Sequence, residues 1–211
     1  MTEDMSMKIG RHKRVIAVYP HTSKLDYMYH MMYVASLDIL HTRAKTVINS
    51  KFMSTPIIGQ VASLFGAISV QDDGGTFDYI YDKLNHMENF YLFISPKGSI
   101  APAKWKTGYY NLAKKLNAEL VVVGLDYVKR ELVIGDYFYV GDMTFEETTK
   151  RLQGDMAHIH PLNTEYLEYE SPHMYSLEDP NSFGDLGDLA FLIIVVVIVI
   201  VAVALIVLAN R

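Results

Sequence analysis

The chain has 211 residues, of which 50% are hydrophobic, and it carries a formal net charge of −5 at pH 7. It contains no cysteine, which excludes disulfides, thiolate catalysis and cysteine-ligated zinc. The acidic balance argues against nucleic acid as a partner.

Four segments of different composition follow one another along the chain. We expect a basic N-terminal arm over residues 1–14, one α/β domain over 15–160, a polar tether over 161–188 and a transmembrane helix over 189–209. The second segment is long enough to bury one core, so a single folded domain is predicted.

Short apolar runs alternate with helical patterns over residues 15–160, and this alternation predicts a mostly parallel mixed sheet flanked by helices. The first apolar run, residues 15–19, is typical of a buried strand that ends at Pro20. Thr76 is the expected N-cap of one helix, and Thr144 with Glu147 forms a capping-box pattern at the start of another. Strands are predicted at 15–19, 46–49, 68–70, 91–94, 120–127 and 132–135, the last two as a hairpin, and helices at 27–40, 56–65, 76–87, 107–116 and 144–158.

The C-terminal segment, residues 189–209, contains only Leu, Ile, Val, Ala and Phe. As a helix it would be roughly 31 Å long, which matches the hydrocarbon core of a bilayer. We therefore predict a single-pass C-terminal anchor with membrane lipids as partners. The N-terminus shows no signal sequence, so the domain is expected on the cytosolic side.

The main candidates for chemistry are His21 and Asp26, five positions apart and directly after the first predicted strand. An aspartate that accepts from one imidazole nitrogen fixes the tautomer and raises the basicity of the other nitrogen, which can then deprotonate a hydroxyl. The spacing of the two residues alone is not specific for a catalytic pair, but their position between a predicted strand and a predicted helix favours one. We expect no metal site, because His158 and His160 have no apparent third ligand.

Four blocks of sequence carry a resemblance to a known family. They are Pro-His-Thr-Ser-Lys-Leu-Asp at 20–26, Gly-Ala-Ile-Ser-Val at 66–70, Phe-Ile-Ser-Pro-Lys-Gly-Ser at 93–99, and Trp-Lys-Thr-Gly-Tyr-Tyr-Asn-Leu-Ala at 105–113 with Gly-Leu-Asp-Tyr at 124–127. Their order and gaps resemble the glycerolipid acyltransferase family, whose first block is a His-x4-Asp motif and whose third reads Pro-Glu-Gly-Thr. The fourth block resembles a bacterial-type branch of that family.

The resemblance implies transfer of a fatty acyl group from acyl-CoA or acyl-carrier protein to a lipid hydroxyl, such as a lysophospholipid or glycerol phosphate, in phospholipid synthesis or remodelling. It implies direct transfer with no bound cofactor and no metal. His21 would be the general base and Asp26 its orienting partner. The predicted substrate-binding residues, which line the site or supply charge to the acceptor or acyl donor, are Ser23, Lys24, Asp72, Lys97, Gly98, Ser99 and Lys106.

The sequence departs from the family at three positions that bind its glycerol-phosphate acceptor. Asp72, Lys97 and Ile100 stand where the family has Arg, Glu and Arg. Two guanidinium groups, the best geometry for a phosphate, are thereby lost. Asp72 and Lys97 form either an exchanged ion pair that keeps the shape of the site or two solvated surface charges. The alternative function is therefore a catalytically weak or inactive family member that acts as a membrane-anchored lipid-binding or scaffold protein.

Overall fold

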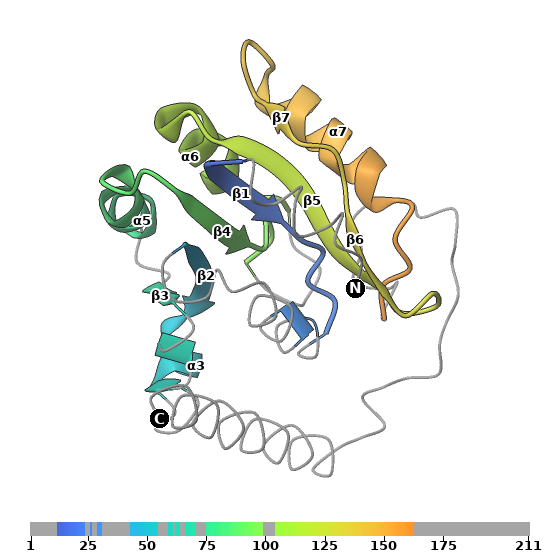
Figure 1. The fold of residues 1–211 in the computed structure, drawn as a ribbon, viewed down its shortest axis with the longest axis horizontal. Coiled ribbons are helices and arrows are strands. Elements are labelled where there is room, and N and C mark those ends of the chain that lie inside the picture. The colour runs from blue at the N-terminus through green and yellow to red at the C-terminus, as the bar shows by residue number, and fades with distance from the viewer. Residues whose placement is uncertain are drawn as a thin grey trace, which may run out of the picture.

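A computed structural model shows an α/β domain built on a mostly parallel mixed sheet, which confirms the predicted fold class for the domain (Figure 1). The structure describes residues 12–23, 26, 29–30, 43–54, 59–60, 62–63, 66–70, 75–98 and 104–162. Within these ranges no helix has both the length and the apolar character needed to cross a membrane. The predicted transmembrane helix at 189–209 lies outside them, as do residues 1–11 of the arm and 163–188 of the tether.

The sheet has the strand order β3-β2-β4-β1-β5-β6, and β7 also pairs with β5. The parallel strands are β1 (Arg14–Val18), β2 (Ala44–Asn49), β3 (Ala67–Val70), β4 (Phe90–Ile94) and β5 (Glu119–Asp126), whereas β6 (Glu131–Ile134) and β7 (Phe138–Tyr139) run antiparallel to β5. Figure 1 shows β1 between β4 and β5 in the middle of the sheet. Central parallel strands are buried on both faces, which explains their continuous apolar sequences.

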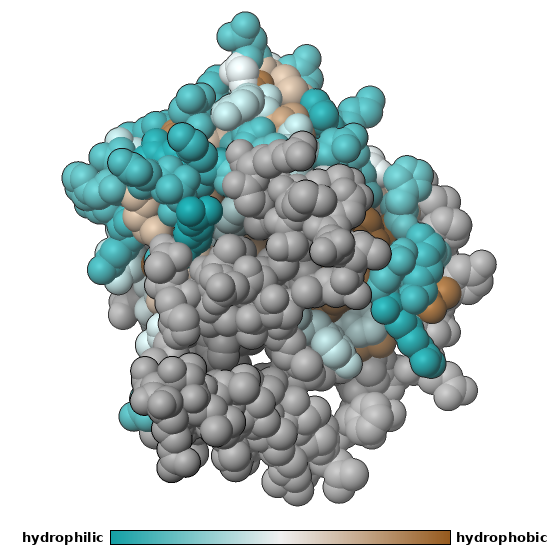
Figure 2. Space-filling model, viewed as in Figure 1, coloured by the Kyte–Doolittle hydropathy of each residue, from teal (hydrophilic) through white to brown (hydrophobic). Residues whose placement is uncertain are grey.

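Three helices, α5 (Thr76–Asn85), α6 (Gly108–Leu116) and α7 (Phe145–Met156), supply the main core together with one face of the sheet. A further single turn, α3 (Ser50–Met53), follows β2. Successive strand residues point to opposite faces, so alternate residues of β1 and β5 enter a second buried cluster on the other face. The helices are amphipathic, and most of the visible surface around them is hydrophilic, with a few apolar residues between the polar ones (Figure 2). The buried strand residues of the main core are Ile16, Val18, Ile68, Phe90, Leu92, Leu120, Val122 and Phe138, and those of the second cluster include Val15, Ala17, Val121 and Val123.

Most predicted elements are confirmed with small shifts at their ends. The β5–β6 hairpin is present, and the Thr144–Glu147 capping box forms at the start of α7. The predicted cap at Thr76 is wrong, because Thr76 is the first residue of α5. The N-cap residue is Gly75, which has no side chain that could cap the helix. Strand β7 was not predicted, since two residues carry too little pattern to indicate a strand. Much of the predicted helices at 27–40 and 56–65 lies outside the described residues.

The residue before β3 must be glycine. Gly66 has a φ of +73°, a conformation that side chains with a Cβ atom rarely adopt. A Cβ atom at this position would lie 2.3 Å from the backbone oxygen of Ala44 on the neighbouring strand β2. The glycine of the second sequence block therefore has a structural reason, because it lets the chain enter β3 close to β2.

Gly66→Ala should lower the free energy of unfolding by about 1–3 kcal/mol, since it combines backbone strain with a clash against Ala44. Gly154→Ala is the matched control, because a Cβ atom at this exposed position of α7 meets nothing within 4 Å. That control should stabilise the protein by about 0.5–1 kcal/mol. Urea unfolding followed by circular dichroism measures both changes, and wild-type stability of Gly66→Ala would contradict this explanation.

Candidate active site

The predicted site lies at the carboxyl edge of the sheet, where the chain leaves β1, β4 and β5. These strands are parallel neighbours, and Val18 at the end of β1 is in register with Ile94 on β4 and Val122 on β5. The segments that follow the three strands therefore meet at one edge, which is where open α/β sheets bind ligands. His21 follows β1 at this edge.

Asp26 is buried and closes a tight turn after β1. Its side chain is 4% exposed, and its Oδ2 atom accepts hydrogen bonds from the backbone N–H groups of Thr22 at 2.7 Å and Ser23 at 2.9 Å. The Thr22 hydroxyl donates to the same oxygen at 3.4 Å. The other carboxylate oxygen, Oδ1, accepts from the hydroxyl of Tyr127 at 2.6 Å. Both oxygens are thus held by donors from the ends of two different strands.

These contacts keep the Asp26 carboxylate ionised. Burial alone raises the pKa of a carboxyl group, because it penalises the charged form. Here the adjacent His21 ring and the hydrogen bonds from Tyr127 and Thr22 outweigh burial, so the pKa of Asp26 lies below its ordinary value of 3.8. The site therefore contains a fixed negative charge next to a histidine.

His21 lies beside this carboxylate, with its Nδ1 atom 3.8 Å from Asp26 Oδ2. Nδ1 is buried and makes no hydrogen bond to any described residue, because 3.8 Å exceeds hydrogen-bonding distance. Contacts between catalytic groups are often longer than hydrogen bonds before substrate binds and then shorten in the complex. The ring of Tyr19 packs edge-on against the imidazole, with 5.7 Å between ring centroids. With Nδ1 facing the carboxylate, Nε2 is the nitrogen left to accept a proton.

A second histidine, His30, lies close to the pair, because its ring and that of His21 both contact the ring of Tyr19. Its side chain is buried against Tyr19, with ring centroids 4.6 Å apart, and lies near Phe93. Burial is the main cause that lowers the pKa of His30 to about 4, with a smaller contribution from the nearby His21. His30 is therefore neutral near pH 7 and adds an uncharged aromatic surface to this side of the site.

The segment between β4 and α6 contains four of the predicted substrate-binding residues, and the structure describes Lys97, Gly98 and Lys106. Lys97 is 4% exposed, so the interpretation of this residue as a solvated surface charge is wrong. Gly98 has a φ of +74°, and a Cβ atom there would lie 3.4 Å from the Nζ atom of Lys106. The Lys106 backbone N–H donates to Pro96 at 2.9 Å, which fixes this lysine against the same loop. The structure thus brings Gly98 and Lys106 together, whereas Lys97 is shown to be buried in the same loop.

The remaining predicted substrate-binding residues have different outcomes. Ser23 contacts Asp26 through its backbone N–H group, so it belongs to the turn that holds the carboxylate. Lys24, Asp72 and Ser99 lie outside the described residues, and so does Ile100. The exchanged pair of Asp72 with Lys97 therefore stays a prediction. Among the residues that the structure does describe, no group of three or more His, Asp or Glu side chains could hold a metal ion.

Sequence reasoning missed Tyr127, the hydrogen-bond donor to Asp26, although it named the Gly-Leu-Asp-Tyr block that contains it. It also missed the contact between Asp126 and His160 at 2.6 Å. One signal was present, since Asp126 and Tyr127 come at the carboxyl end of the longest predicted strand. Parallel topology places that end at the same sheet edge as His21.

Neither a scan of protein-family models nor a search of curated proteins finds a match for this chain. The resemblance to the glycerolipid acyltransferases therefore stays a prediction that rests on the four sequence blocks.

The lowered pKa of Asp26 predicts a pH-dependent contribution to stability. A carboxylate with a lowered pKa stabilises the folded state above its ordinary pKa of 3.8, and this stabilisation is lost as the pH falls below that value. Asp26→Asn should therefore cost about 1–3 kcal/mol near pH 7 and progressively less below about pH 4. The exposed Asp82→Asn is the control. Urea unfolding at several pH values measures the difference, and a difference independent of pH would contradict the assignment.

Proposed function

We propose that this chain is a membrane-anchored acyltransferase that moves a fatty acyl group from acyl-CoA or acyl-carrier protein to a lipid hydroxyl. One observation carries the proposal: the Nδ1 atom of His21 faces the buried, ionised carboxylate of Asp26 at 3.8 Å, at the carboxyl edge of a parallel sheet. A histidine oriented in this way is suited to deprotonate a hydroxyl. The classes of acyl donor and acceptor in this proposal are those that the resemblance of the four sequence blocks implies.

In the proposed reaction Nε2 of His21 takes the proton of the acceptor hydroxyl while its oxygen attacks the thioester carbonyl. The tetrahedral intermediate collapses with cleavage of the carbon–sulfur bond. The departing thiolate then accepts from the imidazolium the proton that came from the acceptor hydroxyl. Asp26 stabilises the imidazolium in between, because its negative charge faces Nδ1. The acyl group passes directly from sulfur to oxygen, so no acyl-enzyme forms.

The loop after β4 supports an anionic substrate. Lys106 brings its ammonium group close to Gly98, and the buried Lys97 precedes Gly98 in the chain, in the loop after the strand that neighbours β1. An ammonium group binds a phosphate as a point charge, without the two-pronged geometry of arginine. We therefore propose that these lysines contact the headgroup of the lipid acceptor or the phosphates of the acyl donor.

The second candidate function is lipid binding without turnover, as a membrane-anchored scaffold. The 3.8 Å gap between His21 and Asp26 favours it, because the hydrogen bond that would fix the imidazole is not made. The exchanged residues Asp72, Lys97 and Ile100 also favour it. The two candidates differ in one respect, since only the enzyme releases thiol and forms an acylated lipid.

His21→Ala should abolish acyl transfer, and Asp26→Asn should lower kcat by about 10²–10⁴, the range for losing positioned base catalysis. The assay uses the detergent-purified full chain with long-chain acyl-CoA and a panel of lysolipids, and follows thiol release and the lipid product by mass spectrometry. His86→Ala, an exposed histidine after α5, is the control and should retain activity. Wild-type turnover by His21→Ala would contradict the mechanism, and lipid binding without product would favour the scaffold.

Residues 180–211 fused to a soluble reporter should sediment with membranes and resist carbonate extraction, because the apolar segment favours the bilayer. The same fusion with Val199→Arg is the control, since an arginine at the helix centre costs about 2.5–3.5 kcal/mol of insertion free energy. A fusion that stays in the soluble fraction would contradict the proposed anchor.

A further inference from the structure

Tyr127 reaches from the end of β5 to Asp26, which lies 101 residues earlier in the chain. Its hydroxyl donates to Asp26 Oδ1 at 2.6 Å, a distance typical of a strong hydrogen bond to a charged oxygen. The backbone donors of Thr22 and Ser23 use only Oδ2, the oxygen that faces His21. Tyr127 is therefore the described residue that holds the other half of the carboxylate.

The second contact matters because the terminal torsion of an aspartate is soft. With donors on Oδ2 alone, the plane of the carboxylate can tilt about this torsion, and the direction in which Oδ2 faces His21 is less well defined. Burial, followed by the negative charge of Asp26, raises the pKa of the Tyr127 hydroxyl above its ordinary value of 10.0. Tyr127 thus stays protonated and acts as a hydrogen-bond donor rather than as a base.

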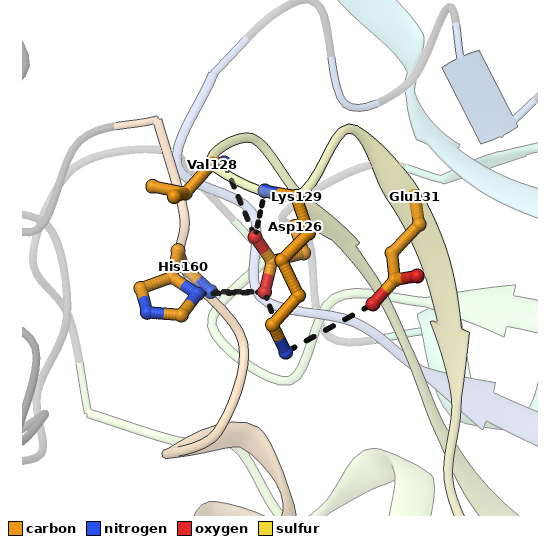
Figure 3. Close-up of polar contacts among 5 residues, drawn as sticks. All are labelled: Asp126, Val128, Lys129, Glu131 and His160. Atoms are coloured by element: carbon orange, nitrogen blue, oxygen red, sulfur yellow. Dashed lines mark hydrogen bonds and ion pairs between the residues drawn. The ribbon is translucent and has the colours of Figure 1, made fainter.

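A second buried carboxylate fixes the position of Tyr127. Asp126, which is 1% exposed, accepts hydrogen bonds from the backbone N–H groups of Val128 at 3.1 Å and Lys129 at 2.8 Å, and closes the turn after β5 (Figure 3). Its Oδ2 atom also contacts the ring Nδ1 of His160 at 2.6 Å. The backbone N–H of Tyr127 donates to the carbonyl of His160 at 2.9 Å.

These contacts form a continuous path from the segment after α7 to the proposed base. His160 binds both Asp126 and the backbone of Tyr127, Tyr127 binds Asp26, and Asp26 faces His21. Figure 3 shows the His160 ring pointing at the Asp126 carboxylate from a separate segment of the chain. Every carboxylate oxygen along this path is engaged by an N–H or O–H group.

We propose that Tyr127 is a positioning residue for the acyl transfer, which holds the Asp26 carboxylate so that Oδ2 faces His21, and that the Asp126–His160 contact holds Tyr127 in place. This inference rests on the proposed function. Tyr127 acts through Asp26 and does not contact the reacting atoms, so its removal should lower the rate of the chemical step and leave substrate binding unchanged.

The full chain with Tyr127→Phe should show a kcat about 10- to 100-fold lower, the effect of one hydrogen bond to a charged group, while KM stays within about twofold. Tyr109→Phe is the matched control, because Tyr109 is also buried and its hydroxyl bonds to Thr149 at 2.7 Å, within the helical layer. It loses a comparable hydrogen bond and should retain wild-type kcat.

A double-mutant cycle separates positioning from general destabilisation. In the Asp26→Asn background the carboxylate is already gone, so adding Tyr127→Phe should change kcat by less than about twofold. His160→Ala should lower kcat, whereas His160→Asn should restore most of it, because the asparagine amide can donate to Asp126. Thermal unfolding of each variant checks that the fold is intact, and the His160 pair tests the inference independently of Tyr127→Phe.

If the wild type is active and Tyr127→Phe has the same kcat, this inference is wrong while the proposed function still stands. The inference would also be wrong if Tyr127→Phe lowered kcat by the same factor in the Asp26→Asn background as in the wild type. The tyrosine would then act by a route that does not involve the Asp26 carboxylate. A wild type that forms no acylated lipid with any acceptor would overturn the proposed function and, with it, the role of Tyr127.

Discussion

The buried carboxylate of Asp26 is the constraint on which the candidate site depends. A buried charge is strongly unfavourable unless hydrogen bonds replace its water. Asp26 obtains these bonds from the turn after β1 and from Tyr127 at the end of β5. The same contacts that compensate its burial therefore join two segments of the chain and fix the charge that faces His21. Stability and orientation of the site have one physical origin.

The sheet topology makes this arrangement possible. Strand β1 lies between β4 and β5, so the segment with His21 has the ends of two parallel strands as neighbours. One neighbour presents Tyr127 and Asp126, and the other leads into the loop with Lys97. The helices α5, α6 and α7 pack against the sheet away from this edge and build the core that keeps the strands in register. Binding and proton transfer are thus proposed for loops on a rigid sheet.

The sequence predicts the features that depend on neighbouring residues. Apolar runs identify β1 and β5, the Thr144–Glu147 spacing identifies the start of α7, and the strand-then-helix context selects His21 with Asp26. It does not predict the bond between Tyr127 and Asp26, because residues 101 positions apart have no shared periodic pattern. The sequence also leaves the burial of Lys97 undecided, because burial depends on which distant residues pack against the loop after β4.

We infer that Asp26 orients His21 so that Nε2 is free to accept a proton. Nitrogen NMR of the protein labelled in its histidine side chains measures this directly, with the His21 signals assigned by comparison with His21→Gln. We expect neutral His21 to carry its proton on Nδ1, the nitrogen that faces Asp26 Oδ2. A spectrum in which the proton resides on Nε2 would contradict it, because the nitrogen directed at the substrate would then be a donor and not a base.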